Sequence, residues 1–206
     1  MGPEEAYAKL RDAILVGRLQ PNERLVEADL VSSFDVPRAA VRTAIVRLAQ
    51  EGLVEHERNR GAKVRRVDQE EAVEILQARA VLEGLAAREA ARRASDAQVA
   101  ELRGILAAMR ERLDAGDLLG VSERNATLHS TIMAISGHRT VARLVGSLRS
   151  QLVRFQYRTI LQPGRPERSF GEHTRVVDAI AAHDGDAAEA AMRAHLMQVT
   201  DALKHA

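Results

Sequence analysis

Three histidines of the sequence lie at positions where a helix would point its side chains into the protein. His129, His173 and His195 each lie on an apolar stripe with the period of a buried helix face. Asn125 precedes His129 by one helical turn and shares its face. A buried polar group needs a partner, and imidazole nitrogens suit zinc, nickel, copper or iron. The pattern therefore indicates a metal-binding pocket rather than three unrelated core histidines.

Two of these histidines are expected to meet because of where the chain turns. The last two predicted helices form a hairpin that turns at Asp184 and Gly185. His173 and His195 are each 11 residues from position 184. They should therefore lie level with each other inside a helical bundle.

Two other interpretations of the histidines remain open. Three histidines with an open coordination position can activate water in a metal-dependent hydrolase. The stripes, however, carry no Asp or Glu beside the histidines to act as a base, and we expect no enzymatic activity. In the other interpretation the histidines only pack inside a helical interaction module that holds no metal.

Arg79 is a charged residue on a stripe that is otherwise apolar. A buried guanidinium must be paired, and Glu83, one helical turn later, could pair with it. Alternatively Arg79, with Arg154 or Arg158, receives the carboxylate of an effector whose other end meets the metal.

Composition and periodicity predict a mainly α-helical protein around this pocket. Hydrophobic residues make up 46% of the 206 residues but aromatic residues only 2%, which favours helices packed by aliphatic side chains. The sequence has no cysteine for disulfides or thiolate ligation and no apolar run long enough to span a membrane. We therefore expect an unprocessed, cytoplasmic protein. We place a first domain at residues 1–67 and a second, antiparallel all-helical domain at residues 68–206, with helices at about 69–93, 97–114, 117–136, 139–161, 168–183 and 185–204.

The N-terminal part is predicted to be a winged helix-turn-helix. Periodic apolar residues indicate helices at about 4–16 and 27–33 and a third that starts near Pro37 and ends near Gly52. Residues 53–57 and 62–67 then read as two strands of a hairpin, in which Gly61 supplies a positive φ. Residues 36–67 contain eight lysines and arginines against three acidic residues, a local charge of +5, while the rest of the chain carries −4. Such a local basic field is typical of a module that binds a polyanion.

The residues predicted to contact DNA lie on the third helix and on the hairpin tip. The second helix of a helix-turn-helix enters the major groove with its N-terminal residues at the base edges. An arginine there can bond guanine in bidentate fashion, while the hairpin tip is placed to contact the minor groove or its phosphates. The predicted DNA-binding residues are Arg38, Arg42, Thr43, Arg58, Asn59, Arg60 and Gly61.

The sequence resembles the GntR superfamily of bacterial regulators, specifically its FadR-like branch. The resemblance is carried by residues 7–30, by VPRAAVRTAIVRLAQEGLVEHERNRGAKV at 36–64, and by the start of the second domain at 70–91. It implies that Arg38 and Arg42 contact an operator and that Gly61 forms the wing turn. It also implies a homodimer that binds double-stranded DNA under the control of a small organic-acid effector.

The second domain resembles the FCD sensor domain of these regulators, in which one Asp and three His hold a divalent metal. The positions that match the family's ligands are Asn125, His129, His173 and His195, and the resemblance implies that they form a metal site. Zinc is the first candidate for the metal, with nickel or another transition metal as alternatives. The sequence departs from the family pattern here, because Asn125 stands where the family has Asp.

The DNA-binding part also departs from the family pattern. Asp35 stands in place of the turn Gly, Pro37 in place of a Ser that opens the third helix, and Ala28 in place of an Arg. Asp tolerates the left-handed conformation better than most residues, so the turn can form. The loss of a hydroxyl and an arginine should remove contacts to the DNA backbone and change the operator preference.

Overall fold

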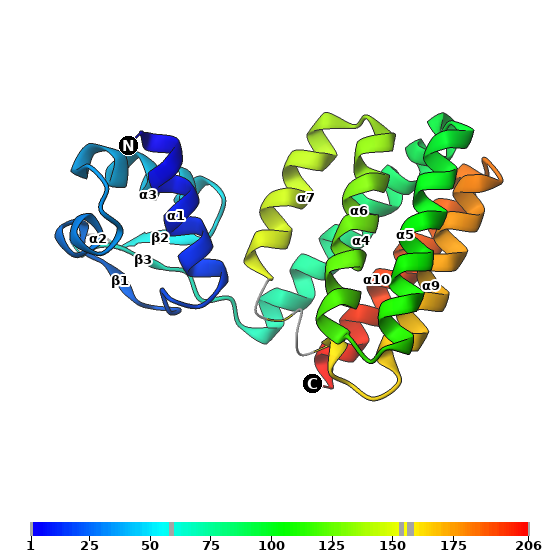
Figure 1. Cartoon of the computed structure of the whole chain (residues 1–206). Coiled ribbons are helices and arrows are strands. Elements are labelled where there is room, and N and C mark those ends of the chain that lie inside the picture. The colour runs from blue at the N-terminus through cyan, green and yellow to red at the C-terminus, as the bar shows by residue number, and fades with distance from the viewer. Residues whose placement is uncertain (1, 58–59, 153–154, 156–158, 206) are drawn as a thin grey trace. The chain divides into compact units, whose positions relative to one another are not determined.

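The computed structural model describes residues 2–57, 60–152, 155 and 159–205. These residues fold into two compact units, each with its own helices (Figure 1). The first unit comprises Met1–Asp68 and Ser147–Arg154, and the second comprises Gln69–Gly146 and Phe155–Ala206. The fold is mainly α-helical with one small sheet, as the sequence predicts.

Three helices and a short turn form the helix-turn-helix of the first unit. The helices are α1 (Pro3–Leu15), α2 (Glu27–Phe34) and α3 (Arg38–Gln50). Asp35 ends α2 in the left-handed conformation, with φ 50° and ψ 57°, so Asp fulfils the role expected of a glycine at this turn. Pro37 is the N-cap of α3, which makes Arg38 the first residue of the helix.

A three-stranded antiparallel sheet completes the winged fold. The strands are β1 (Arg24–Leu25), β2 (Val54–Glu57) and β3 (Gly61–Val64), in the order β1-β3-β2. The predicted hairpin is confirmed, and Gly61 starts β3 with φ 83°, a conformation that disfavours residues with a Cβ. The sequence did not predict β1, because two residues are too few to show the alternation of a strand.

The core of the first unit is formed by aliphatic side chains from every element. Val41, Ala44, Ile45 and Leu48 of α3 are all buried. They pack with side chains of α1, α2 and the sheet in one hydrophobic cluster. This burial fixes the rotation of α3 about its axis, so the opposite face, with Arg38 on it, faces solvent.

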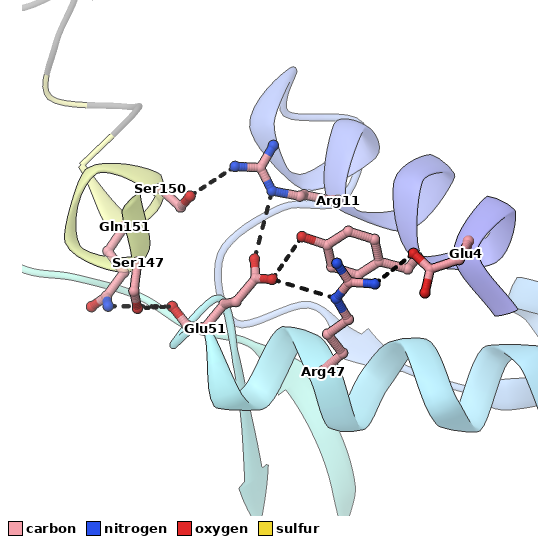
Figure 2. A network of polar contacts seen from close by, with 8 residues as sticks. Glu4, Arg11, Arg47, Glu51, Ser147, Ser150 and Gln151 are labelled. Atoms are coloured by element: carbon pink, nitrogen blue, oxygen red, sulfur yellow. Dashed lines mark hydrogen bonds and ion pairs between the residues drawn. The ribbon is translucent and has the colours of Figure 1, made fainter. Parts of the chain in front are cut away.

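The end of α7 (Arg139–Gln151) belongs to the first unit from Ser147 onward. Glu51, at the end of α3, accepts hydrogen bonds from Tyr7 Oη at 2.7 Å and, through its backbone carbonyl, from Ser147 Oγ at 3.0 Å (Figure 2). Arg11 donates to Ser150 Oγ at 2.8 Å. Polar contacts thus join the last turn of α7 to α1 and to the end of α3.

Five long helices form the core of the second unit: α4 (Gln69–Arg93), α5 (Asp96–Asp114), α6 (Leu118–Ser136), α9 (Arg165–Ala181) and α10 (Gly185–Lys204). α4 packs against α6, α9 and α10, and α5 packs against α6 and α9 (Figure 1). Short turns join α5 to α6 and α9 to α10, so each pair is antiparallel. None of the helices in the described part of the chain is both long and apolar enough to cross a lipid bilayer.

The expected continuous helix at 139–161 is interrupted at Leu152, and Thr159 and Ile160 are again helical. α7 ends at Gln151, and Leu152 forms a turn. The interval from Leu152 to Leu161 has no glycine or proline, so its sequence gave no signal for a helix end.

Candidate functional sites: a buried histidine cluster and an arginine-rich surface

The three predicted histidines converge inside the second unit. His129 comes from α6, His173 from α9 and His195 from α10, and one nitrogen of each lies within 4.8 Å of the other two. Nε2 of His129 is 3.2 Å from Nε2 of His173, and the ring centroids of His173 and His195 are 4.2 Å apart. All three side chains are buried. The symmetric spacing about position 184 therefore places two of the rings together as predicted.

Two buried glutamates contact the Nδ1 atoms of His129 and His195, which face away from the centre of the cluster. Glu83 of α4 is 2.5 Å from Nδ1 of His129, and Glu172 of α9 is 2.7 Å from Nδ1 of His195. A carboxylate that accepts from Nδ1–H fixes the ring tautomer and leaves the Nε2 lone pair for a metal. Histidines that bind metals in proteins are commonly supported in this way.

Each glutamate is in turn paired with an arginine. Arg79 Nε donates to Glu83 at 2.7 Å. Arg165, at the start of α9, donates to both carboxylate oxygens of Glu172 at 3.1 and 2.9 Å. Buried charges are tolerated when they are paired in this way. Two series of polar contacts, each running from an arginine through a glutamate to a histidine, therefore support the cluster from different helices.

The expectation that no acidic residue lies beside the histidines was wrong. Glu83 and Glu172 both contact them directly. Each carboxylate is, however, bonded to a histidine and an arginine, so neither is a free base for water activation. Arg165 was not predicted because it lies between the expected helices at 139–161 and 168–183, in a segment that contains Pro163, Gly164 and Pro166.

The cluster has the chemistry of a metal site. Oδ1 of Asn125 and Nδ1 of His173 are buried polar atoms without a hydrogen-bond partner among the described residues, although buried polar atoms are nearly always satisfied. Burial, followed by the neighbouring imidazoles, lowers the pKa of His173 well below 6.5, and burial likewise lowers the pKa of His195. Both rings are therefore neutral at neutral pH, the form that binds a cation. An amide oxygen and imidazole nitrogens fit a divalent transition metal.

Of the three arginines predicted to bind an effector, the structure describes only Arg79. Arg79 forms the ion pair with Glu83 that the sequence offered as one interpretation, and its side chain is 12% exposed. Its Nε is thus engaged, which leaves the Nη nitrogens for any further ligand. Arg154 and Arg158 lie outside the described residues.

On the first unit, five of the seven predicted DNA-contacting residues are described, and they lie on an exposed, arginine-rich surface. Arg38 and Arg42 occupy the first and second turns of α3, with side chains 67% and 63% exposed. Thr43 is exposed, and its hydroxyl donates to the carbonyl of Ala39 in the preceding turn. Arg60 and Gly61 on the wing are also exposed. Arg58 and Asn59 lie outside the described residues.

α3 and the β2–β3 hairpin border an open surface hollow of about 560 Å³. Its lining includes Arg24, Arg38, Arg42, Arg60 and His56. This arrangement places basic side chains from the sheet, from α3 and from the wing around one concave surface. Such a surface suits a polyanion with a convex edge.

Glu27 is an acidic residue of this surface that could not be predicted from the sequence. It is the first residue of α2, and its carboxylate accepts hydrogen bonds from Arg38 and Arg42 at 2.8 Å each. These two arginines lower the pKa of Glu27 below its ordinary value, and the carboxylate in turn raises the pKa of Arg42. Its position at a helix start was the only signal in the sequence.

Comparison with known proteins matches both parts of the chain. Residues 3–64 match the family described as bacterial regulatory proteins, gntR family, and residues 74–198 match the FCD domain. A helix-turn-helix transcriptional regulator from an unstable DNA locus of Streptomyces ambofaciens is 33% identical over 199 residues, 96% of this chain and 83% of the relative. The transcriptional repressor RspR of Escherichia coli K12 is 25% identical over 201 residues, 98% of this chain and 88% of the relative.

A solved structure supports the fold assignment. Escherichia coli McbR/YncC superposes with a TM-score of 0.80 at 18% sequence identity, over 98% of this chain and 97% of the other. At this level of identity the likeness concerns the fold alone.

Proposed function

We propose, from the premise that this chain belongs to the gntR family of bacterial regulatory proteins and carries an FCD domain, that a metal-containing pocket controls its binding to DNA. Family membership makes the chain a transcription regulator of the helix-turn-helix type. The proposal adds the metal, the effector, the homodimer and the individual residues that carry each role.

The DNA-binding role falls to α3 and the wing. Arg38 and Arg42 enter the major groove, where a guanidinium reads guanine or anchors a phosphate, and Thr43 lies beside them. The wing residues Arg58, Asn59, Arg60 and Gly61 contact the minor groove or its phosphates. Two copies of the chain bind the two halves of a near-palindromic operator.

The sensing role falls to the histidine cluster. His129, His173 and His195 would hold a divalent metal, with Asn125 as a weaker fourth ligand because its amide oxygen is neutral. The metal, zinc in the first instance, supplies a buried positive charge to which a small carboxylate can bind. Glu83 and Glu172 orient two of the rings, and the Nη nitrogens of Arg79, with Arg154 or Arg158, receive the effector's carboxylate.

Control of DNA binding requires that the effector bind one state of the protein better than the other. The three histidines lie in the second unit, whereas the residues proposed to contact DNA belong to the first. Effector binding must therefore change the spacing or the order of the two winged units in the dimer.

The observation that carries the proposal is the convergence of three imidazoles whose outward nitrogens on His129 and His195 are tied to carboxylates. Packing alone does not explain it, because the inward nitrogens face one another rather than apolar side chains. A metal-dependent hydrolase is not favoured, since both neighbouring acids are already engaged with arginines.

The experiment uses the full-length protein and a duplex that it selects from a random-sequence library. Metal content is measured by elemental analysis for the wild type, for His173→Ala and for His205→Ala, an exposed histidine outside the cluster. We expect about one metal per chain, lost only in His173→Ala. Binding to the selected duplex is then measured with zinc-loaded and chelator-treated protein against a panel of small mono- and dicarboxylic acids. An acid that changes duplex binding only in the loaded protein supports the proposal. Equal metal content in the three proteins, or no acid that acts, overturns it.

A further inference from the structure

Glu27 bridges the two arginines of α3 that face the hollow. Its Oε2 accepts from Nε of Arg38 and its Oε1 from Nε of Arg42, both at 2.8 Å. Each carboxylate oxygen thus holds one arginine, although the arginines lie four residues apart on α3. The carboxylate comes from a different helix, α2.

The contact engages Nε of each arginine and leaves the terminal Nη groups available. A guanidinium is planar, so a hydrogen bond at Nε fixes the direction in which the Nη groups point. Bidentate contact with guanine requires two N–H groups in a fixed orientation. An exposed arginine without such a support must lose rotamer freedom when it binds a base, which weakens specific binding.

The carboxylate also changes the charge of the surface. Among the described residues that line the hollow, Glu27 is the only acidic one, against Arg24, Arg38, Arg42 and Arg60. Binding to any DNA, whatever its sequence, rises with the number of phosphates that cationic groups neutralise. A negative charge at this place therefore reduces sequence-independent binding.

We propose that Glu27 is a specificity-determining residue that positions Arg38 and Arg42 for base recognition and weakens their binding to DNA of any sequence. This inference rests on the proposed operator reading by the two arginines. Both effects act in one direction: they widen the difference in affinity between the operator and other DNA.

A simpler role for Glu27 is stabilisation of α2, because an acidic residue in the first turn of a helix interacts favourably with the helix dipole. Asp29 lies in the same first turn and is exposed. Within the described part of the chain, Arg38 and Arg42 form their ion pairs with Glu27 and not with Asp29. Asp29→Asn therefore removes one negative charge from the same helix start and leaves the arginine bridge intact, which makes it the matched control.

The test compares full-length wild type, Glu27→Gln, Glu27→Ala and Asp29→Asn on the selected duplex and on a scrambled duplex of equal length at one salt concentration. We expect both Glu27 variants to bind the scrambled duplex more tightly and the selected duplex more weakly. Their ratio of affinities should fall by about tenfold or more, since a well-formed bidentate contact discriminates by roughly 10- to 100-fold. Asp29→Asn should leave the ratio unchanged, and thermal unfolding should show that all variants are folded.

A second measurement separates positioning from general weakening. Each variant is allowed to select duplexes from a random library, and the base preference at each position is compared with those of Arg38→Ala and Arg42→Ala. Glu27→Gln should relax preference at the positions that the arginine variants relax. If it behaves like Asp29→Asn while the arginine variants relax their positions, this inference is wrong and the operator reading stands. If the arginine variants relax no position, the operator reading itself fails and this inference falls with it.

Discussion

Glu172 lies 2.7 Å from Nδ1 of His195, on the neighbouring helix, while Arg165 holds the same carboxylate through two hydrogen bonds. The carboxylate of Glu172 is thereby held between Arg165 and His195, and its contact orients the His195 ring. Burial raises the pKa of Glu172, and Arg165 opposes that shift. The arginine therefore helps to keep the carboxylate in the ionised form that accepts from the ring.

The first prediction concerns this supporting carboxylate. Glu172→Gln should lower the affinity for zinc by about 10- to 100-fold, the usual effect of losing a carboxylate behind a metal-binding histidine. It should also lower the free energy of unfolding by about 3 kcal/mol, because it leaves the Arg165 charge buried without its partner. Competition with a coloured chelator measures the first quantity and urea denaturation the second. Glu167→Gln, in the first turn of the same helix, is the control and should change neither; unchanged zinc affinity in Glu172→Gln would contradict the supporting role.

The second prediction concerns the residue that departs from the family pattern. Asn125→Asp should raise the zinc affinity, because a carboxylate is a stronger ligand than an amide oxygen. Without metal the same variant should unfold at a lower temperature than the wild type, because it buries a carboxylate that has no cationic partner. The increase in unfolding temperature on adding zinc should therefore be larger in Asn125→Asp than in the wild type. A zinc-dependent increase no larger than that of the wild type would place Asn125 outside the site.

The histidine cluster could be predicted because the spacing of its residues follows the period of a helix. Asn125 and His129 share a face through their spacing of one turn, and His173 and His195 meet because a turn lies midway between them. Glu172 could not be predicted in the same way. It precedes His173 by one residue and therefore points in a different direction from α9. Its contact with His195 depends on how α9 and α10 are rotated against each other, which the period of one helix does not fix.

The arginine bridge was missed for a related reason. Arg38 and Arg42 are placed by the spacing within α3, but Glu27 reaches them only because the turn at Asp35 brings the start of α2 beside the start of α3. The left-handed geometry of that turn was expected, whereas the side chains that it brings together follow from the angle between the helices. The end of α7 at Gln151 has no local stop signal in the sequence, and its last turn donates hydrogen bonds to the backbone carbonyl of Glu51.

The third prediction concerns the arginines of α3. Arg38→Ala and Arg42→Ala should each weaken binding to the selected duplex by about 1–3 kcal/mol if they read a base. An arginine that contacts a phosphate instead should reduce the slope of log affinity against log salt by about one unit. Electrophoretic mobility shift at several salt concentrations distinguishes the two roles. Arg92→Ala, an exposed arginine of the second unit, is the charge-matched control, and equal losses in all three variants would show that only net charge matters.

The fourth prediction is a dependence of stability on pH in the metal-free protein. Burial holds the pKa values of His173 and His195 well below the ordinary value of 6.5 in the folded state. Below pH 6.5 the unfolded state therefore binds more protons than the folded state, so the stabilisation is complete above pH 6.5 and is lost as the pH falls toward the lowered pKa values. Each histidine can contribute a slope of up to roughly 1.4 kcal/mol per pH unit in this range.

Other charged groups around the cluster modify this slope without reversing it. The groups that face the two rings are His129, Glu83, Arg79, Glu172 and Arg165. The raised pKa of Glu172 acts in the opposite sense, because the folded state then binds a proton above pH 4.5 that the unfolded state has lost. Two histidines against one carboxyl leave a net loss of stability on acidification. Urea denaturation with chelator between pH 5 and 8 measures it, and His173→Gln should reduce the slope by about half or more. A free energy of unfolding that stays constant or rises from pH 6.5 to 5 would show that the rings are not held neutral by burial.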